Sequence, residues 1–196
     1  EKIRYNDAAG DEIIEVRKPI TEDFVIMRPT LLYSLIKNAK DNINRNITDI
    51  RFFETTKTFK RVEGKIEEEQ KFGIILGGEP EKYIWNVKPM PYDFYDLKGI
   101  VEEIFSKIRF EKYTLVRTTK ESYHPGRAAD IYVGKEYIGT FGELHPDVIE
   151  NFDLKKKLLT AELRLEALIK YSDKNIFFKG INKFPAVPRD LALVIE

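Results

Sequence analysis

Two histidines and a pair of aspartates are the residues whose types could support metal or acid–base chemistry. His124 and His145 each precede a proline, and neither belongs to a recognised metal-binding motif. We therefore expect both histidines to shape turns or to form local hydrogen bonds. Asp93 and Asp96 could bind Mg²⁺, but a helix N-cap and a first-turn acid explain their spacing without a metal. We predict no catalytic residue and no metal site.

Phosphate chemistry would need a glycine-rich loop or arginines that face the phosphates. The segment 77–80 has two glycines but lacks the lysine and the serine or threonine of a phosphate-binding loop. Arg51 and Glu54 lie in one strand-like segment, and we expect them to form edge or interface pairs. Arg127 and Glu143 lie on neighbouring predicted strands, where a cross-strand ion pair is expected.

The charge balance argues against a protein that is attracted as a whole to nucleic acid. Lysine plus arginine number 33, and aspartate plus glutamate also number 33. A surface making about 6–10 phosphate contacts would need a local cluster of positive charge instead. Two clusters provide candidate RNA contacts, namely Lys155, Lys156 and Lys157 in the first, and Lys179, Lys183 and Arg189 in the second. The alternative is a solvated loop and a solvated linker.

Composition indicates a folded protein. Hydrophobic residues make up 42% and charged residues 34% of 196 positions, unlike the composition of disordered chains. The chain has no cysteine, no run of 18 apolar residues and no signal peptide, so we expect a cytoplasmic protein without a membrane partner. It begins at Glu1 inside a strand-like pattern, which suggests a piece of a longer chain.

Hydrophobic periodicity predicts the elements that position these residues. One helix starts at Thr30, with apolar residues every fourth position, and a second starts after Asp93 as N-cap. The apolar face of this second helix comprises Leu97, Ile100, Val101, Ile104, Phe105 and Ile108. Strand patterns occur at 12–17, 49–60, 70–78, 112–118, 130–133, 137–144 and 158–163.

The connections between these segments complete the prediction. A turn at 62–69 joins two strands, and Gly134-Lys135 forms a tight hairpin. One helix starts after His145-Pro146, and a short one covers 165–170. Strands joined by short turns, with helices between some of them, predict an α+β fold with a mostly antiparallel sheet flanked by helices.

Several segments in a fixed order carry a family resemblance: MRPTLLYSLI at 27–36, FFE at 52–54, DFYDLKG at 93–99, HPGRAADIYV at 124–133, IGTFGELHPDV at 138–148 and KFPAVPRDLALVI at 183–195. Together they resemble the beta subunit of bacterial phenylalanyl-tRNA synthetase over nearly the whole chain. The resemblance implies a catalytically inactive core of the class II synthetase type at residues 1–172. At residues 173–196 it implies a linker and the first strand of a truncated ferredoxin-like anticodon-binding domain.

The same resemblance implies an alpha2-beta2 heterotetramer. In that family the alpha subunit uses ATP and Mg²⁺ to activate phenylalanine and transfer it to tRNA, while the beta core packs against alpha and needs no cofactor of its own. An active class II member has a Gly-x-Gly-x-x-Arg signature, which brings the backbone close to ATP and supplies an arginine. The comparable segment here is 160–168. It lacks glycine, and Ala167 stands at the arginine position, with Arg164 nearby.

These departures favour a structural and assembly module over an enzyme. The strand with Arg51 and Glu54 resembles a class II substrate strand, but the arginine strand and long loop that should precede it are absent. We expect the subunit interface among Arg28, Arg51, Phe52, Glu54, Trp85, Phe94 and Tyr95, although most of the aromatics could be core. The alternatives are an independent class II-like ATP-dependent ligase and a stand-alone RNA-binding module.

Overall fold

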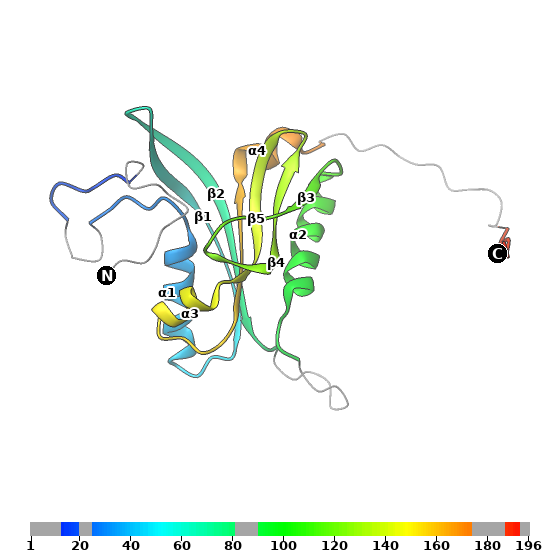
Figure 1. Ribbon diagram of the computed structural model, residues 1–196, viewed down its shortest axis with the longest axis horizontal. Helices are drawn as coiled ribbons and strands as arrows, with labels where there is room; N and C mark the ends of the chain where they lie inside the picture. The colour runs from blue at the N-terminus through cyan, green and yellow to red at the C-terminus, as the bar shows by residue number, and fades with distance from the viewer. Residues whose placement is uncertain (1–12, 20–24, 81–89, 174–186, 193–196) are drawn as a thin grey trace.

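The computed structural model describes residues 13–19, 25–80, 90–173 and 187–192. The described elements are, in chain order, α1 (Leu32–Ile43), β1 (Asp49–Val62), β2 (Lys65–Gly78), α2 (Phe94–Ile108), β3 (Thr114–Arg117), β4 (Tyr123–Val133), β5 (Glu136–Leu144), α3 (Pro146–Asn151), β6 (Leu158–Arg164) and α4 (Leu165–Tyr171). The strands form one antiparallel sheet in the order β1-β2-β6-β5-β4-β3 (Figure 1). The predicted α+β fold class is confirmed.

Helices cover both faces of this sheet. On one face, called the α2 face, α2 packs against β5 and β6, and α4 packs against β2 and β6. The apolar cluster beneath them includes Leu97, Phe105 and Phe141. On the opposite face, called the α1 face, α1 packs against β1, β2 and β6 and buries Leu35 and Ile75. Figure 1 shows α1 and α3 on one side of the sheet and α2 on the other.

The start of α2 follows the predicted chemistry. The Asp93 side chain accepts hydrogen bonds from the backbone N–H groups of Tyr95 and Asp96, at 2.7 and 3.2 Å. In return, the Asp96 carboxylate accepts the Asp93 N–H at 2.7 Å, which completes a capping box. The predicted apolar face is correct except at Ile100, which is 37% exposed because the buried stripe of Leu97 and its neighbours passes beside it.

The turn of the β1–β2 hairpin was predicted at residues 62–69, and this prediction was wrong. The turn is Glu63-Gly64, both with positive φ (49° and 79°), and β2 already begins at Lys65. Residues 65–69 show no burial alternation because the ribbon extends beyond β6 and is largely exposed. Cross-strand ion pairs hold this extension, including Lys57 with Glu68 at 2.7 Å. The main-chain ladder with β1 therefore continues past the buried part of the sheet.

Two other strand predictions were too long. The segment predicted at 12–17 has one isolated bridge, between Glu15 and Ile26, within its described residues, because only two flanking main-chain hydrogen bonds support it. β3 covers only Thr114–Arg117 and is exposed throughout. The β4–β5 hairpin, β6 and α4 form as predicted, although β4 starts earlier, at Tyr123, through a bulge that accommodates Pro125.

The division into residues 1–172 and 173–196 stays a prediction. Residues 187–192 contain no helix or strand, and 174–186 and 193–196 lie outside the described residues. Among the described helices, none combines the length and apolarity needed to span a membrane.

Candidate functional site

A row of five residues crosses the α1 face of the sheet. Directly opposite residues of antiparallel strands share a face, and the register aligns Glu54 of β1, Gly73 of β2, Glu162 of β6, Thr140 of β5 and Asp130 of β4. We call these five residues the polar row. Three of them are acids, so the row is the part of the described sheet where carboxylate chemistry would be expected.

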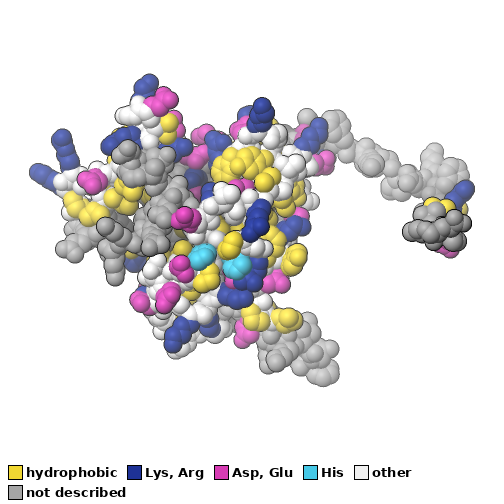
Figure 2. All heavy atoms as spheres, in the orientation of Figure 1, with side chains coloured by type: hydrophobic (Ala, Val, Ile, Leu, Met, Phe, Trp, Pro, Cys, Tyr) yellow, Lys and Arg dark blue, Asp and Glu magenta, His cyan; other side chains and the backbone are white. Residues whose placement is uncertain are grey.

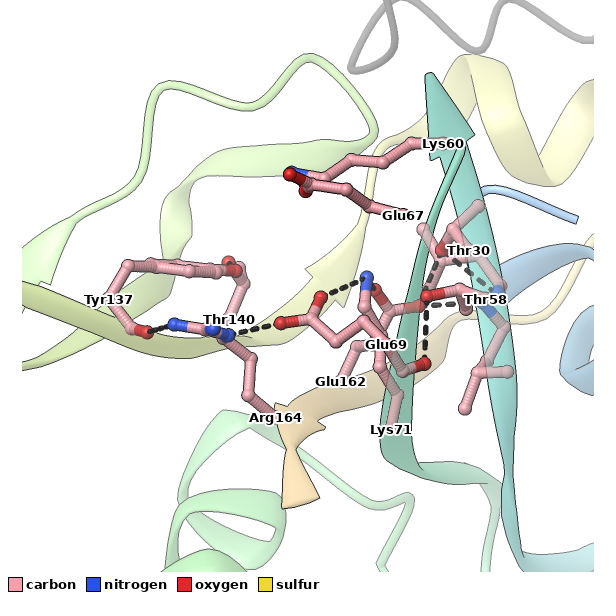
Figure 3. Close-up of polar contacts among 12 residues, drawn as sticks. Thr30, Thr58, Lys60, Glu67, Glu69, Lys71, Tyr137, Thr140, Glu162 and Arg164 are labelled. Carbon is pink, nitrogen blue, oxygen red and sulfur yellow. Dashed lines mark hydrogen bonds and ion pairs between the residues drawn. The ribbon is translucent and has the colours of Figure 1, made fainter. Parts of the chain in front are cut away.

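Glu162 is the centre of the polar row. Its carboxylate accepts hydrogen bonds from the Lys71 ammonium at 2.5 Å, the Thr30 hydroxyl at 2.5 Å and the Leu31 backbone N–H at 2.6 Å (Figure 3). Its side chain is only 11% exposed. Both oxygens are therefore engaged by groups from β2 and from the segment that leads into α1.

The ionisation of Glu162 is set by two opposing effects. Burial alone would raise the pKa of its carboxyl group, because it disfavours the charged form. The adjacent Lys71 ammonium, together with the hydrogen bonds from Thr30 and Leu31, outweighs burial and holds the pKa below its usual range. Glu162 is thus a carboxylate at neutral pH and a poor general base.

Gly73 explains how α1 comes so close to the sheet. A Cβ atom at this position would lie 2.8 Å from Leu31 Cδ1 and 2.9 Å from Leu35 Cδ1. On the far side of Gly73, Glu54 pairs with Arg28 at 2.8 Å and accepts a hydrogen bond from the Ser34 hydroxyl at 2.8 Å. The first turn of α1 therefore fills the space above the middle of the polar row.

Arg164 extends the charged network toward the end of the sheet. It pairs with Glu69, donates a hydrogen bond to the Tyr137 carbonyl at 3.0 Å, and lies 3.9 Å from a Glu136 carboxylate oxygen (Figure 3). Its guanidinium group is thus committed to the protein's own acids and backbone.

Hydroxyl groups link the rest of the polar row. The Thr140 hydroxyl donates to Asp130 at 2.5 Å and shares a hydrogen bond with the Tyr137 hydroxyl at 2.6 Å. Lys120 donates to the same Tyr137 hydroxyl at 2.8 Å, and burial raises the pKa of Tyr137 well above its usual range. Within the described part of the chain, every buried side-chain nitrogen or oxygen has a hydrogen-bond partner. The network is suited to holding structure rather than to activating a substrate.

The residues present do not fit ATP as an active class II site would bind it. With Ala167 at the arginine position of Gly-x-Gly-x-x-Arg, the two glycine positions fall at Glu162 and Arg164. Both side chains project onto the α1 face, where glycines would leave room for a ligand, and Glu162 adds negative charge. Ala167 is buried in α4. Among the described residues, no group of three acids or histidines could hold a metal ion.

The predicted interface residues fall into separate environments. Arg28 and Glu54 come together as an ion pair, whereas Arg51 pairs with Asp49 at 2.7 Å, not with Glu54. Phe52 is half-buried on the α1 face. The structure therefore does not unite these residues into one patch.

The predicted aromatic interface residues divide in the same way. Phe94 stacks on Phe141 with ring centroids 5.3 Å apart and belongs to the rim of the core, whereas Tyr95 is 74% exposed. Trp85 lies outside the described residues. Phe53, which follows Phe52 in β1, is also 74% exposed, because successive residues of a strand point to opposite faces of the sheet.

The histidines behave as predicted. The Nδ1 atom of His124 accepts the Gly126 N–H at 3.1 Å, and that of His145 accepts the Asp147 N–H at 3.2 Å and caps α3. Figure 2 shows the two histidines side by side on the surface. Both therefore have local structural roles.

A groove of about 590 Å³ lies beside these turns, between α3 and the β3–β4 connection. Its lining residues carry charges of both signs, namely those of Arg117, Lys120, Glu121 and Asp147. The Arg117 Nε group donates to the Pro125 carbonyl at 2.7 Å, which commits part of its guanidinium group. The groove thus shows no preference for a ligand of one charge.

The candidate RNA contacts are only partly described. Lys155, Lys156 and Lys157 are exposed in the loop between α3 and β6, whereas Lys179 and Lys183 lie outside the described residues. Glu143 lies 3.9 Å from Lys157 and pairs with Arg127 at 2.7 Å, as predicted for the cross-strand pair.

Solved structures of similar shape define the fold class. Two structures of pyrrolysyl-tRNA synthetase from Desulfitobacterium hafniense align with a TM-score of 0.59 at 14% and 15% identity. Each alignment covers 81% of this chain and 52% of the synthetase chain. The fold is therefore that of a class II aminoacyl-tRNA synthetase core.

The family follows from the sequence comparison. Residues 1–165 match the model of the phenylalanyl tRNA synthetase beta chain CLM domain, and the chain belongs to this family. It is 47% identical over 95% of its length to the phenylalanine–tRNA ligase beta subunit of Fusobacterium nucleatum. The subunit of Syntrophus aciditrophicus is 32% identical over 96% of the chain, and that of Clostridium tetani 34% over 93%. The chain spans 24%, 24% and 22% of these relatives, respectively.

Proposed function

We propose that this chain is the non-catalytic core of a phenylalanine–tRNA ligase beta subunit. In this role it supports the alpha subunit and the assembly of an alpha2-beta2 heterotetramer. The heterotetramer uses ATP and Mg²⁺ to attach phenylalanine to its tRNA in the cytoplasm. Family membership and the names of the relatives support the assignment to the ligase.

One observation carries the non-catalytic part of the proposal. Glu162 and Arg164 stand where an active class II core has glycines, and their charges are engaged by Lys71, Thr30 and Glu69. A triphosphate at this place would have to displace α1 and meet a buried carboxylate. Both changes are unfavourable, because they break charge-assisted hydrogen bonds and bring like charges together.

The test is isothermal titration calorimetry of the purified chain with ATP–Mg²⁺, alone and with phenylalanine. We expect no saturable heat up to about 1 mM ATP, a concentration at which an affinity of only about −4 kcal/mol would give half-saturation. Saturable micromolar binding would instead support the alternative, an independent class II-like ligase. Arg51, Glu54 and Arg164 would then be the first residues to mutate.

A matched experiment addresses the assembly role. Full-length beta subunit is expressed with alpha, and the mass of the complex is measured by light scattering. We expect a beta subunit from which residues 1–172 are deleted to fail to form the heterotetramer, whereas a Lys155→Glu, Lys156→Glu, Lys157→Glu variant should assemble normally. If that variant assembles but binds tRNA more weakly, the result would support the predicted contact between the first lysine cluster and tRNA.

A further inference from the structure

The two histidines occupy turns of the same kind that differ in one residue. Both turns have the sequence His-Pro-x, in which x is Gly126 after His124 and Asp147 after His145. Proline has no N–H group, so the first amide that each imidazole can reach belongs to residue x. The Nδ1 atom accepts that amide at 3.1 Å in the His124 turn and at 3.2 Å in the His145 turn. The neutral imidazoles therefore carry their hydrogen on Nε2.

The acid gives the His145 turn an alternative hydrogen-bonding partner. The Oδ2 atom of the Asp147 carboxylate lies 3.6 Å from His145 Nδ1, the same atom that accepts the Asp147 N–H. Nδ1 accepts a hydrogen bond only while it carries no proton, and once protonated it becomes a donor. Gaining a proton would thus break the bond to the Asp147 amide and allow one to the Asp147 carboxylate. In the His124 turn, Gly126 has no side chain that could offer this exchange.

The exchange acts on the start of α3. The His145 imidazole is the N-cap of this six-residue helix, and the His145 carbonyl accepts the N–H groups of Val148 and Ile149 at 3.0 and 3.2 Å. Ile149 is buried in the apolar cluster of the α1 face, which anchors the helix there. Loss of a side-chain cap weakens a helix, and an exposed ion pair recovers only part of that loss. Protonation of Nδ1 should therefore loosen the start of α3.

Other titratable and charged groups near the His145 turn have both signs. They come from β3, the β3–β4 connection, β4 and β5, and comprise Arg117, Lys120, Glu121, His124 and Glu143. The two cations that line the groove also bind elsewhere. Arg117 donates to the Pro125 carbonyl at 2.7 Å, and Lys120 donates to the Tyr137 hydroxyl at 2.8 Å. The acid of the turn itself therefore has the decisive position for the imidazole.

We propose that His145-Pro146-Asp147 is a protonation-sensitive turn, in which His145 caps α3 when neutral and pairs with the Asp147 carboxylate when protonated. The His124 turn, with glycine in the third position, only loses its hydrogen bond on protonation. An imidazole changes its charge between about pH 5 and pH 8, so both states of the His145 turn are accessible near neutral pH. Neither state requires ATP, tRNA or the alpha subunit, so the turn is tested apart from the proposed function.

An NMR titration of the full chain tests the exchange, because its sequence contains only these two histidines. Between about pH 8 and pH 5, the Asp147 amide proton should move upfield with the same midpoint as the His145 ring nitrogens, because it loses its acceptor. Asp147→Asn should lower the His145 midpoint by about 0.2–0.7 pH unit, since it removes one exposed ion pair from the protonated form. An Asp147 amide that does not follow the ring, or an unchanged midpoint in Asp147→Asn, would overturn the proposal.

Gly126→Asp is the matched variant that adds the acid to the other turn. A Cβ atom at Gly126 would lie 3.8 Å from His124 Nδ1 and 3.7 Å from its Cε1, which are ordinary contacts, so the new side chain starts beside the ring without a clash. This variant should raise the His124 midpoint by about 0.2–0.7 pH unit and leave that of His145 unchanged. If the His124 midpoint did not move, the third residue of the turn would not control the imidazole, and the idea would fail.

Hydrogen exchange measures the effect on α3. In the parent chain, the protection factor of the Ile149 amide should fall about two- to fivefold between about pH 7.5 and pH 5.5, because the cap is lost over this range. Protection factors are already corrected for the intrinsic pH dependence of exchange, so this fall reports opening of the helix. Constant protection of Ile149 would show that the cap does not hold α3, which would also overturn the proposal.

Discussion

The two faces of the sheet are closed by different physical means. On the α2 face, a continuous apolar cluster joins α2, α4 and the strands. On the α1 face, the apolar cluster includes Ile75 of β2, which lies opposite Thr160 of β6. Two residues away along the same strands, Gly73 lies opposite Glu162, so the polar row begins directly beside the apolar packing. Charge compensation thus takes over from hydrophobic burial along the α1 face.

This difference shows what the acids contribute. A buried carboxylate is tolerated only when partners restore the interactions that it had in water. Glu162 has three such partners, and Glu54 has an arginine and a serine. The α1 face should therefore respond to pH and to charge-removing substitutions, whereas the α2 face should respond mainly to lost volume.

The largest effect is expected from a cavity on the α2 face. Phe141 is 1% exposed and stacks on Phe94, so Phe141→Ala should lower the free energy of unfolding by about 3–5 kcal/mol. Urea denaturation at pH 7 and at pH 4 measures this, and the loss should be similar at both values. Tyr95→Ala, at an exposed position, is the control and should change stability by less than about 0.5 kcal/mol. A loss that depends strongly on pH would contradict the contrast between the faces.

A smaller, pH-dependent effect is expected at the centre of the α1 face. Glu162→Gln leaves the Lys71 ammonium without its carboxylate and should cost about 2–3 kcal/mol at pH 7. The pKa of Glu162 is lowered on folding, so its contribution is present above the unfolded value of about 4.3 and is lost as pH falls through the lower folded value.

The measurement is a urea denaturation series from pH 7 to pH 2.5 for the parent chain and for Glu162→Gln. The stability difference between the two should shrink below about pH 4, because the parent loses this contribution on protonation. A difference that stayed constant across the series would show that Glu162 acts through shape rather than charge.

The elements of this fold were readable from the sequence where burial imposes a period. α1, α2 and the β4–β5 hairpin have apolar stripes or a tight turn, and each was predicted close to its observed position. The β1–β2 turn was misplaced because residues 65–68 are all exposed, so no alternation marks them as a strand. Apolar periodicity identifies only the segments that have a buried face, so it does not predict the exposed part of this hairpin.

The polar row was not predicted, and the reason is topological. Glu162 and Thr30 are separated by 132 positions and meet only because β6 lies inside the sheet next to β2. In contrast, the N-cap at Asp93 and the histidine turns involve neighbours in sequence, and these were predicted correctly. Local chemistry could be inferred from the sequence, whereas the charge network required the order of the strands.

The smallest effect is expected at the exposed end of the polar row. The Arg28–Glu54 pair has side-chain exposures of 44% and 28%, against 16% and 11% for Lys71–Glu162. A double-mutant cycle with Arg28→Ala and Glu54→Gln should give a coupling energy of about 0.2–1 kcal/mol. This coupling should fall further at about 0.5 M NaCl, because salt screens exposed charges more than buried ones.

The same cycle with Lys71→Met and Glu162→Gln should give a larger coupling that changes less with salt. Burial then sets the strength of each pair, since the two carboxylates occupy the same row and differ mainly in their access to water. Equal couplings in the two cycles would refute this explanation. The network would then have to be held by the hydrogen bonds of Thr30 and Ser34, which Thr30→Ala and Ser34→Ala would weaken to a similar extent.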